Sequence, residues 1–511
     1  MLNLKELKNF ARESASMLAR QKDLADFEIY CSSGQELIAR LNYTSDIPCR
    51  GVEEVKSSDA AGFAIRVVFR RDARESATAS EAGDLSLESL RRTLDRARRQ
   101  AVVDPHFPGL PNGPNAHVAA TVRPGDLMRA PDAAIVEAAW KIVHSALNAF
   151  ARNAPSGLTM PGLIIGGDVT LLRDRIALAG SHFPDIRTDE SAHFRASVTA
   201  LIEALDAKGT ASVLGNSRDE LGRLASLGAR AVNGALKLRH GQRPSSGIYR
   251  VMLGPQPVAE VLNYMVIPSL TAGAFHAASS AYQGRFGASV MDSRLSLIDD
   301  PQAGPGAVRR RISCEGLPAR RVELVRDGRL IGLLSNFYDA RRLIADEDRR
   351  DKLGPQAEPG IEFATVNGYR LGDGGERRFD ANPGTAATNV FMRARGGVNE
   401  RALLKALGDG IYVGRIWYTY PINGQRAGDF TCTITGDSWL VERGELVAPL
   451  APNCLRINAT IDQVFGALVA VGNRCRPAQV WGSPEAYYVP AIVVDALPLS
   501  AIGPAVGSGS G

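Results

Sequence analysis

Metal-binding motifs built from cysteine or histidine are missing from this chain. Its six cysteines lie far apart without a C-x-x-C pair, which in a chain of 511 residues favours reduced thiols over a disulfide framework. Its seven histidines include no two at the close spacing of an H-E-x-x-H helix. These absences argue against a small disulfide-rich domain. A metal site would have to be assembled from distant histidines.

Other common signatures are absent as well. The chain has no Walker A loop, no G-x-S-x-G elbow and no dinucleotide-binding fingerprint after a strand. No stretch approaches about 18 uninterrupted apolar residues, and the start has no apolar core of signal-peptide type. A net charge of +5 is weakly basic for this length and does not favour nucleic acid as a partner. We therefore expect no membrane span, no nucleic-acid partner and a cytoplasmic location.

What is present is the composition of an ordinary folded protein, with 45% hydrophobic and 23% charged residues. Because a single core rarely grows beyond about 250–300 residues, a chain of 511 residues predicts at least two domains. The clearest boundary is the Pro-, Ser- and Gly-rich GQRPSSG at 241–247. We predict domains over 1–243 and 244–503. The chain ends in GSGSG, which predicts a flexible tail over 504–511, either native or introduced by cloning.

The two halves differ in their hydrophobic patterns. In the first, FEIYCS and ELIARLN alternate like the strands of a half-buried hairpin, and Asp132 precedes a long apolar helix over 133–150. In the second, Asp327-Gly328 supplies the turn of a hairpin over 321–335, and short strands form a meander over 411–450. The predicted fold class is α+β. An N-terminal helix-on-sheet domain precedes a C-terminal twisted antiparallel sheet or partial barrel.

An ordered set of segments in the second half resembles the TldD/PmbA family, whose PmbA member is also called TldE. The segments are YRVMLGPQPVAEVLNYMVIPSL, AYQGRFGASVMDSRLSLIDDP, CEGLPARRVELVRDGRLIGLLSNFYDARRL, GDGIYVGRI, NGQRAGDFT and RINATIDQVFGALVAVGNR. In the first half, FAIRVVFR followed by a serine-led helix and a Pro-rich stretch is similar to the family's N-terminal domain. The resemblance covers roughly residues 1–500, and its specificity lies in the order of the segments.

The resemblance implies a metallopeptidase made of two different subunits. The TldD-type subunit carries H-E-x-x-x-H on the helix after the strand, with a downstream cysteine as a further zinc ligand and the glutamate as general base. Here Ala259 and Tyr264 occupy the two histidine positions, and Glu260 occupies the position of the base. Alanine has no donor atom, and a phenol is a poor zinc ligand at neutral pH. The downstream ligand falls in the strand 429–436, where Cys432 and Thr435 are equal candidates.

These substitutions make the chain similar to the metal-free TldE type. A single thiolate at Cys432 cannot replace three ligands, so we predict no metal, no cofactor and no catalytic residue in this chain. Glu260 without a metal-bound water has nothing to activate. It is more simply interpreted as bonding the hydroxyl of Tyr264 or facing solvent. Asp299 and Asp300, which precede Pro301, are likewise more simply interpreted as structural carboxylates at a turn.

The predicted function is that of a non-catalytic subunit in a TldD/TldE-type heterodimeric zinc metallopeptidase. A TldD-like partner would bear the zinc, and this chain would shape a chamber for unfolded, short or precursor peptides. Extended peptides could be held by adding a strand to a sheet edge. Two alternatives stay open. One is a self-associated binding or regulatory protein without a peptidase partner, and the other is an independent hydrolase with an unrecognised site.

Overall fold

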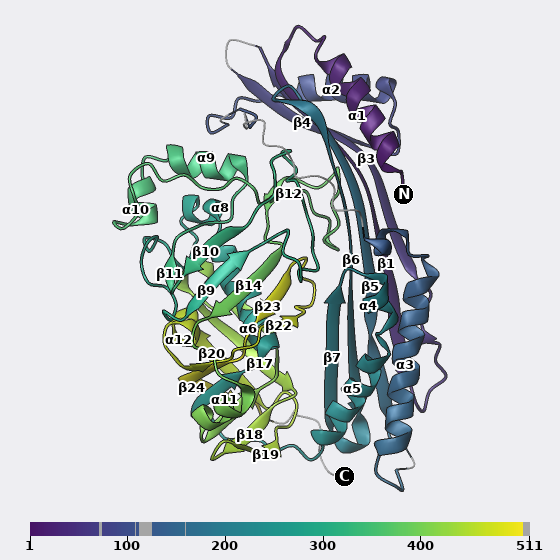
Figure 1. Cartoon of the computed structure of the whole chain (residues 1–511), viewed down its shortest axis with the longest axis vertical. Coiled ribbons are helices and arrows are strands. Elements are labelled where there is room, and N and C mark those ends of the chain that lie inside the picture. The colour runs from purple at the N-terminus through teal and green to yellow at the C-terminus, as the bar shows by residue number, and fades with distance from the viewer. Residues whose placement is uncertain (71–73, 108, 112–124, 159, 504–511) are drawn as a thin grey trace.

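The computed structural model describes residues 1–511 except 71–73, 108, 112–124, 159 and 504–511. The predicted tail therefore lies outside the described residues. A tall N-terminal sheet forms one side of the molecule, with helices on its outer face and the C-terminal half against its inner face (Figure 1). This arrangement confirms the predicted α+β class with an N-terminal helix-on-sheet unit. None of the helices among these residues combines the length and apolar character that crossing a membrane requires.

The N-terminal sheet is antiparallel and contains unusually long strands. It consists of β1 (Leu24–Thr44), β2 (Gly51–Val52), β3 (Lys56–Phe69), β4 (Glu75–Ala82), β5 (Leu163–Gly180), β6 (Phe183–Ile202) and β7 (Ala207–Gly215). The order across the sheet is β4-β3-β1-β5-β6-β7, and β2 pairs with β1. Strands alternate their side chains between two faces, so each long strand serves both the helices outside and the C-terminal half inside.

Helices cover the outer face in two groups. Phe27 and Ile29 of β1 pack with one group, and Leu37 and Ala39, on the same face further along, pack with the other. The first group is α1 (Leu4–Leu18) and α2 (Leu87–Gln100), and the second is α3 (Ala133–Asn153), α4 (Arg218–Gly222) and α5 (Ala225–Lys237). Short 3-10 turns occur at η1 (Asp126–Arg129) and η2 (Glu203–Leu205).

The predicted hairpin near residue 33 is wrong, because β1 runs straight through it as one strand. Ser32, Ser33 and Gly34 look like a turn in the sequence, yet they pair with β3 on one side and β5 on the other. Gly34 is needed for another reason. A Cβ atom there would lie 3.2 Å from the carbonyl oxygen of Arg377, so glycine lets the C-terminal half approach the sheet.

The C-terminal half contains two large sheets and a small one. The first sheet has the order β16-β17-β20-β24-β8-β15-β18-β19 with β21 on β24, the second has the order β11-β10-β9-β14-β23-β22, and β12 pairs with β13. The predicted partial barrel is confirmed as a curled half-barrel, although β8 with β15 and β14 with β23 are parallel pairs. The strands are β8 (Gly247–Leu253), β9 (Leu295–Asp299), β10 (Val322–Arg326), β11 (Arg329–Leu330), β12 (Gly368–Tyr369), β13 (Gly384–Thr385), β14 (Asn389–Ala394), β15 (Gly410–Val413), β16 (Arg415–Pro421), β17 (Asp429–Gly436), β18 (Trp439–Glu442), β19 (Glu445–Pro449), β20 (Leu455–Thr460), β21 (Leu468–Val471), β22 (Arg476–Ala478), β23 (Ala486–Val489) and β24 (Ile492–Ala501).

The helices of this half are short, and the first of them follows β8 directly. They are α6 (Pro255–Val261), α7 (Ile267–Ser269), α8 (Ala272–His276), α9 (Phe337–Ala345), α10 (Arg349–Leu353), α11 (Glu400–Leu407) and α12 (Ile461–Phe465), with a π turn at η3 (Leu262–Val266) and a 3-10 turn at η4 (Gln425–Ala427). α6, η3 and α7 form one continuous helical segment whose apolar side chains belong to the largest core of the chain.

Charged side chains join the two halves across the inner face of the N-terminal sheet. The guanidinium of Arg377, which has no solvent exposure, lies 2.7 Å from Asp174 of β5 and 2.7 Å from Asp189 of β6. Arg311 makes a second ion pair with Asp189 at 2.9 Å. Buried charges need partners of opposite sign. These pairs therefore hold the C-terminal half in one position on the sheet.

Candidate functional site

The helical segment α6–η3–α7 carries the three positions predicted to correspond to a zinc-binding motif. Ala259 is fully buried and Glu260 is 2% exposed, while Tyr264 is half-buried. In η3 the N–H of Ile267 donates to the carbonyl of Leu262, an i→i+5 bond that widens the helix. Pro268 follows and has no N–H to donate to the carbonyl of Tyr264. The wider turn reduces the angle around the helix axis between residues five positions apart. Residues such as 259 and 264 therefore lie closer to the same face of the helix.

Glu260 is held inside the protein by Gln256, one turn earlier on α6. The side-chain amide of Gln256 donates to Oε2 of Glu260 at 2.9 Å. Burial raises the pKa of Glu260 to about 7, and the positive charge of Arg415 and the Gln256 hydrogen bond only partly oppose this rise. Neither interpretation made from the sequence is correct in its detail. The carboxyl does not face solvent, and its hydrogen-bond partner is Gln256 instead of Tyr264.

Tyr264 points towards the loop between β22 and β23. Its hydroxyl donates to the backbone carbonyl of Trp481 at 3.2 Å. Burial, with a contribution from the charge of Glu260, raises the pKa of Tyr264 above its ordinary value. A phenol with a raised pKa stays protonated at neutral pH and is a weak ligand for zinc. Tyr264 therefore connects the helix to a surface loop.

Cys432 lies on β17 and belongs to the same core as Ala259. Its thiol interacts electrostatically with Glu260, so this residue of the strand lies near the motif helix. Thr435 is three positions further along, is also buried, and lies where the register of β17 against β16 shifts. Burial raises the pKa of the Cys432 thiol well above its ordinary value, and the charge of Glu260 adds to the rise. The thiol is therefore protonated, and a zinc ion would have to displace that proton before the sulfur could act as a ligand.

The predicted positions are thus close in space but do not fit a metal ion. Ala259 has no donor atom and the hydroxyl of Tyr264 is bonded to the backbone, so Cys432 would be a single ligand where three are needed. No group of three or more His, Cys, Asp or Glu side chains suited to a metal occurs within the described part of the chain. The segment offers a buried carboxyl, Glu260, whose pKa is about 7, and a tyrosine, Tyr264, that is bonded to the backbone. The predicted positions offer no set of ligands for a Lewis acid.

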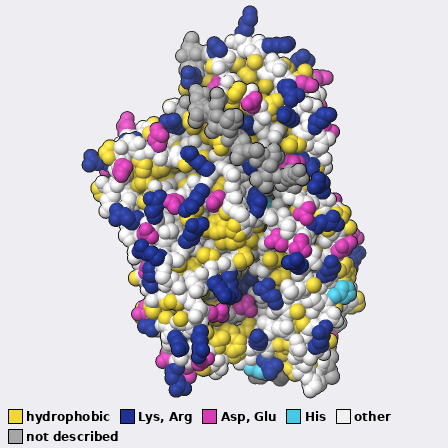
Figure 2. Space-filling view, in the orientation of Figure 1, with side chains coloured by type: hydrophobic (Ala, Val, Ile, Leu, Met, Phe, Trp, Pro, Cys, Tyr) yellow, Lys and Arg dark blue, Asp and Glu magenta, His cyan; other side chains and the backbone are white. Residues whose placement is uncertain are grey.

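Beside Tyr264 the surface is hollow and rich in aromatic side chains, which the sequence analysis did not identify. Asn263 and Tyr264 line an open cavity of about 510 Å³ together with Trp481. Trp417 on the edge strand β16 stacks on Tyr418 at 4.9 Å and contacts Trp481 edge-on at 6.2 Å. All three are exposed, Trp481 by 63%. Figure 2 shows hydrophobic side chains gathered near the middle of one face. The aromatic run of IYVGRIWYTY was the available signal.

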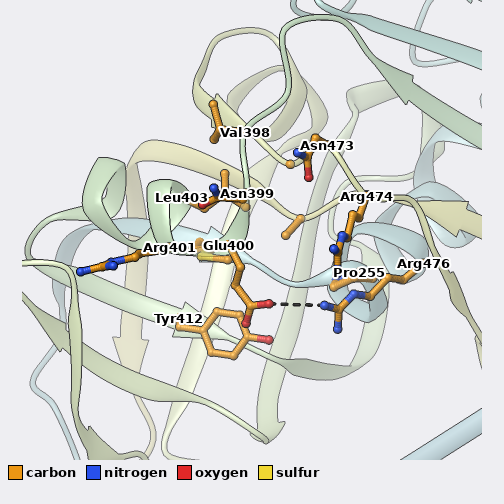
Figure 3. A pocket seen from close by; sticks show the side chains of 13 residues that line it. Pro255, Val398, Asn399, Glu400, Arg401, Leu403, Tyr412, Asn473, Arg474 and Arg476 are labelled. Carbon is orange, nitrogen blue, oxygen red and sulfur yellow. Dashed lines mark hydrogen bonds and ion pairs between the residues drawn. The ribbon is translucent and has the colours of Figure 1, made fainter.

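A second cavity, of about 310 Å³, lies at the other end of α6 and is lined by Pro255, Tyr412 and residues of α11 and the β21–β22 loop. Figure 3 shows Arg474 and Arg476 extending into the same space as Glu400 and Tyr412. The sequence carries no local signal for this cavity, because its lining comes from segments separated by as many as 200 residues or more.

The fold and the helix after β8 together define a metallopeptidase-like protein, with Ala259 and Tyr264 at the two positions that the resemblance assigns to histidine. Residues 246–501 match the family model of the PmbA/TldA metallopeptidase C-terminal domain. The chain therefore belongs to the TldD/PmbA family, as the resemblance in its sequence implied. No curated protein sequence matches the chain.

Solved structures agree in fold along nearly the whole chain. TldE from Thermococcus kodakarensis is 14% identical, with a TM-score of 0.74 over 97% of this chain and 100% of that one. Two proteins named as modulators of DNA gyrase are also similar. The one from Thermotoga maritima is 16% identical, with a TM-score of 0.73 over 96% and 99% of the two chains. The one from Bacteroides thetaiotaomicron is 15% identical, with a TM-score of 0.70 over 97% and 99%.

Proposed function

We propose that this chain is the metal-free, TldE-like subunit of a heterodimeric zinc metallopeptidase in the cytoplasm. The observation that carries the proposal is the motif helix itself. It keeps the fold of a metallopeptidase family but presents a methyl group at Ala259 and a backbone-bonded phenol at Tyr264. The zinc and the catalytic water would belong to a TldD-like partner. This chain would complete and narrow the chamber in which peptides are cleaved.

The substrates proposed for the complex are unfolded, short or precursor peptides. The edge strand β16 lies beside the motif helix, where Gln256 bonds the backbone of Ile416. Beyond Ile416 an edge strand can offer backbone groups to an extended chain. The exposed rings of Trp417, Tyr418 and Trp481 lie at the same place and offer apolar contact to peptide side chains. An unfolded or short peptide can adopt the extended conformation that strand addition to this edge requires.

Co-purification with a homologous chain that bears H-E-x-x-x-H tests the proposal. We expect the two chains to form a stable complex that contains about one zinc per pair. The complex should cleave unfolded substrates such as casein peptides. The isolated chain should have neither zinc nor peptidase activity. Chelator-sensitive turnover by the isolated chain would contradict the assignment and favour an independent hydrolase.

Two tryptophans of matched exposure refine the test. Trp417 is 39% exposed beside the motif helix, and Trp140 is 38% exposed on the outer helix α3. In the assembled complex Trp417→Ala should lower kcat/KM for peptides by about tenfold, as expected for truncating a contact ring. Trp140→Ala should leave it unchanged. Equal effects of the two changes would show that the aromatic surface has no part in substrate binding.

The alternative function is a self-associated binding or regulatory protein. It is favoured by the names of the two relatives described as modulators of DNA gyrase. The mass of the purified chain in solution, measured with and without the zinc-bearing homologue, separates the two proposals. A homodimer that does not exchange subunits with that homologue would favour the alternative.

A further inference from the structure

The cavity at the start of α6 has more basic than acidic groups. Arg474 and Arg476 extend into it from the segment that links β21 to β22 (Figure 3). Arg476 pairs with Glu400 of α11 at 3.3 Å. Arg474 has no ion pair among the described residues, and Arg401 extends away from the others in Figure 3. The cavity therefore holds two guanidinium groups, of which one is paired with a carboxylate.

A hydroxyl group on the cavity wall adds a neutral donor. Tyr412 of β15 points towards the Glu400–Arg476 pair (Figure 3), and its hydroxyl has no hydrogen-bond partner in the part of the chain that the structure describes. Gly254 makes room for it, because a Cβ atom at that position would lie 3.1 Å from the hydroxyl oxygen. Burial raises the pKa of Tyr412 to about 12, so the group stays a phenol and can donate. The amide of Asn473 lines the same cavity.

From this arrangement we propose that the cavity binds a carboxylate of a peptide, held by Arg474 and Arg476 with Tyr412 as a further donor. A guanidinium matches the two oxygens of a carboxylate in a planar, bidentate pair. The cavity volume of about 310 Å³ lies at the small end of ligand sites. It fits one acidic residue or a chain end. The preference for a carboxylate rests on the cavity alone, whereas the assignment of that carboxylate to a peptide rests on the proposed function.

Glu400 occupies part of the proposed site and competes with the ligand. Its carboxylate already engages Arg476, so an incoming carboxylate meets one free guanidinium and one that is shared. Neutralising Glu400 should release Arg476 and remove repulsion between like charges. The structure therefore predicts opposite effects for two neighbouring substitutions. Arg474→Gln should weaken binding, and Glu400→Gln should strengthen it.

Calorimetric titration of the full chain with short blocked peptides tests the site. Acetyl-trialanine with a free carboxylate should bind about tenfold or more tightly than its amide. A second pair, acetyl-Ala-Glu-Ala-amide against acetyl-Ala-Gln-Ala-amide, separates an acidic side chain from a chain end. Arg474→Gln should weaken binding of the better acid by about tenfold, and Glu400→Gln should tighten it by about threefold or more. Arg152→Gln, on the exposed C-terminal turn of α3, is the control and should have no effect.

Several outcomes would overturn the proposal. Equal binding of acids and amides, or no change in Arg474→Gln, would show that the cavity does not select a carboxylate. Weaker binding in both Arg474→Gln and Glu400→Gln, with both variants folded by circular dichroism, would show that Glu400 does not compete with the bound carboxylate. Failure of these titrations leaves partner co-purification and zinc content unaffected, so it is distinguishable from failure of the proposed function.

Discussion

The side-chain amide of Gln256 donates a hydrogen bond to the carboxyl of Glu260 and at the same time bonds the backbone of Ile416. Its Oε1 accepts from the N–H of Ile416 at 3.0 Å, and its Nε2 lies 3.3 Å from the carbonyl of the same residue. Ile416 lies on the edge strand β16, so Gln256 fastens the motif helix to that strand. Glu260 orients this amide from a buried position.

A Glu260→Gln substitution should therefore stabilise the chain, more so at high pH. The pKa of the buried carboxyl is raised to about 7 in the folded chain. Below about pH 4.5 the carboxyl is neutral in both the folded and the unfolded chain, so it costs no stability there. As the pH rises, the unfolded chain ionises first and the free energy of unfolding falls. The loss is complete above about pH 7 and amounts to roughly 3 kcal/mol. Urea unfolding at about pH 5 and pH 8 measures the effect. The free energy of unfolding of the variant should exceed that of the native chain by more at the higher pH.

The control for that experiment is Glu13→Gln on the exposed face of α1. Its effect on the free energy of unfolding should be the same at both pH values. If Glu260→Gln behaves like this control, the carboxyl is not desolvated in solution as the structure indicates.

The same Glu260→Gln variant should change the activity of the assembled complex by less than about tenfold. Loss of a true general base typically costs about 10²–10⁴ in rate, whereas Gln at this position keeps an acceptor for the Gln256 amide. Steady-state peptide cleavage by the complex, with assembly checked by gel filtration, measures the effect. A thousandfold loss with intact assembly would assign Glu260 a catalytic role.

Replacing Asp299 with Asn should destabilise the chain by about 1–3 kcal/mol. Asp299 is fully buried at the end of β9, and its oxygens accept hydrogen bonds from the backbone and hydroxyl of Thr388, the backbone of Asn389 and the amide of Asn367. An asparagine amide would direct N–H groups at some of these donors. Asp300→Asn is the control, because its one acceptor role, towards the N–H of Gln302, is kept by asparagine. Equal unfolding midpoints for the two variants would contradict this structural role.

Replacing Arg377 with Met should cost about 3–5 kcal/mol of stability, because it leaves two buried carboxylates with too little positive charge. Asp174 and Asp189 both lie 2.7 Å from this guanidinium. The exposed Arg223 pairs with the exposed Asp219 at 2.8 Å, so Arg223→Met should change stability by less than about 1 kcal/mol. Denaturant unfolding of both variants measures the difference. If Arg377→Met changed the free energy of unfolding only slightly, water would have to reach the contact between the two halves and solvate Asp174 and Asp189.

Thiol labelling of the folded chain should distinguish Cys49 from Cys432. Cys49 is exposed, whereas Cys432 is buried with a raised pKa. Because the thiolate is the reactive form, iodoacetamide should modify Cys49 first and Cys432 only after denaturant is added. Peptide mass spectrometry identifies the modified sites. Rapid labelling of Cys432 in the native chain would show a thiolate available to a metal.

Local sequence patterns predicted the structure correctly where it depends on residues that are neighbours along the chain. Asp327 and Gly328 form the expected turn with φ values of 46° and 78°, and the helix predicted over 133–150 extends over Ala133–Asn153. Asp132 does not cap that helix with its side chain, however, because its carboxylate pairs with Arg173 at 3.2 Å. The hairpin predicted near Ser33 failed for a similar reason, since ladders on both sides keep β1 extended.

The sequence by itself determined the family resemblance and the α+β class, and it placed Ala259 and Tyr264 where the resemblance implies histidines, because each depends only on which residue stands at which position. The tertiary structure alone decided that Glu260 is buried against Gln256 and that Arg474, Arg476 and Tyr412 line one cavity. Burial and convergence arise from packing between segments that are distant along the chain. The spacing of residues along the chain does not determine which distant segment packs against a given side chain, or how far that packing excludes water from the side chain.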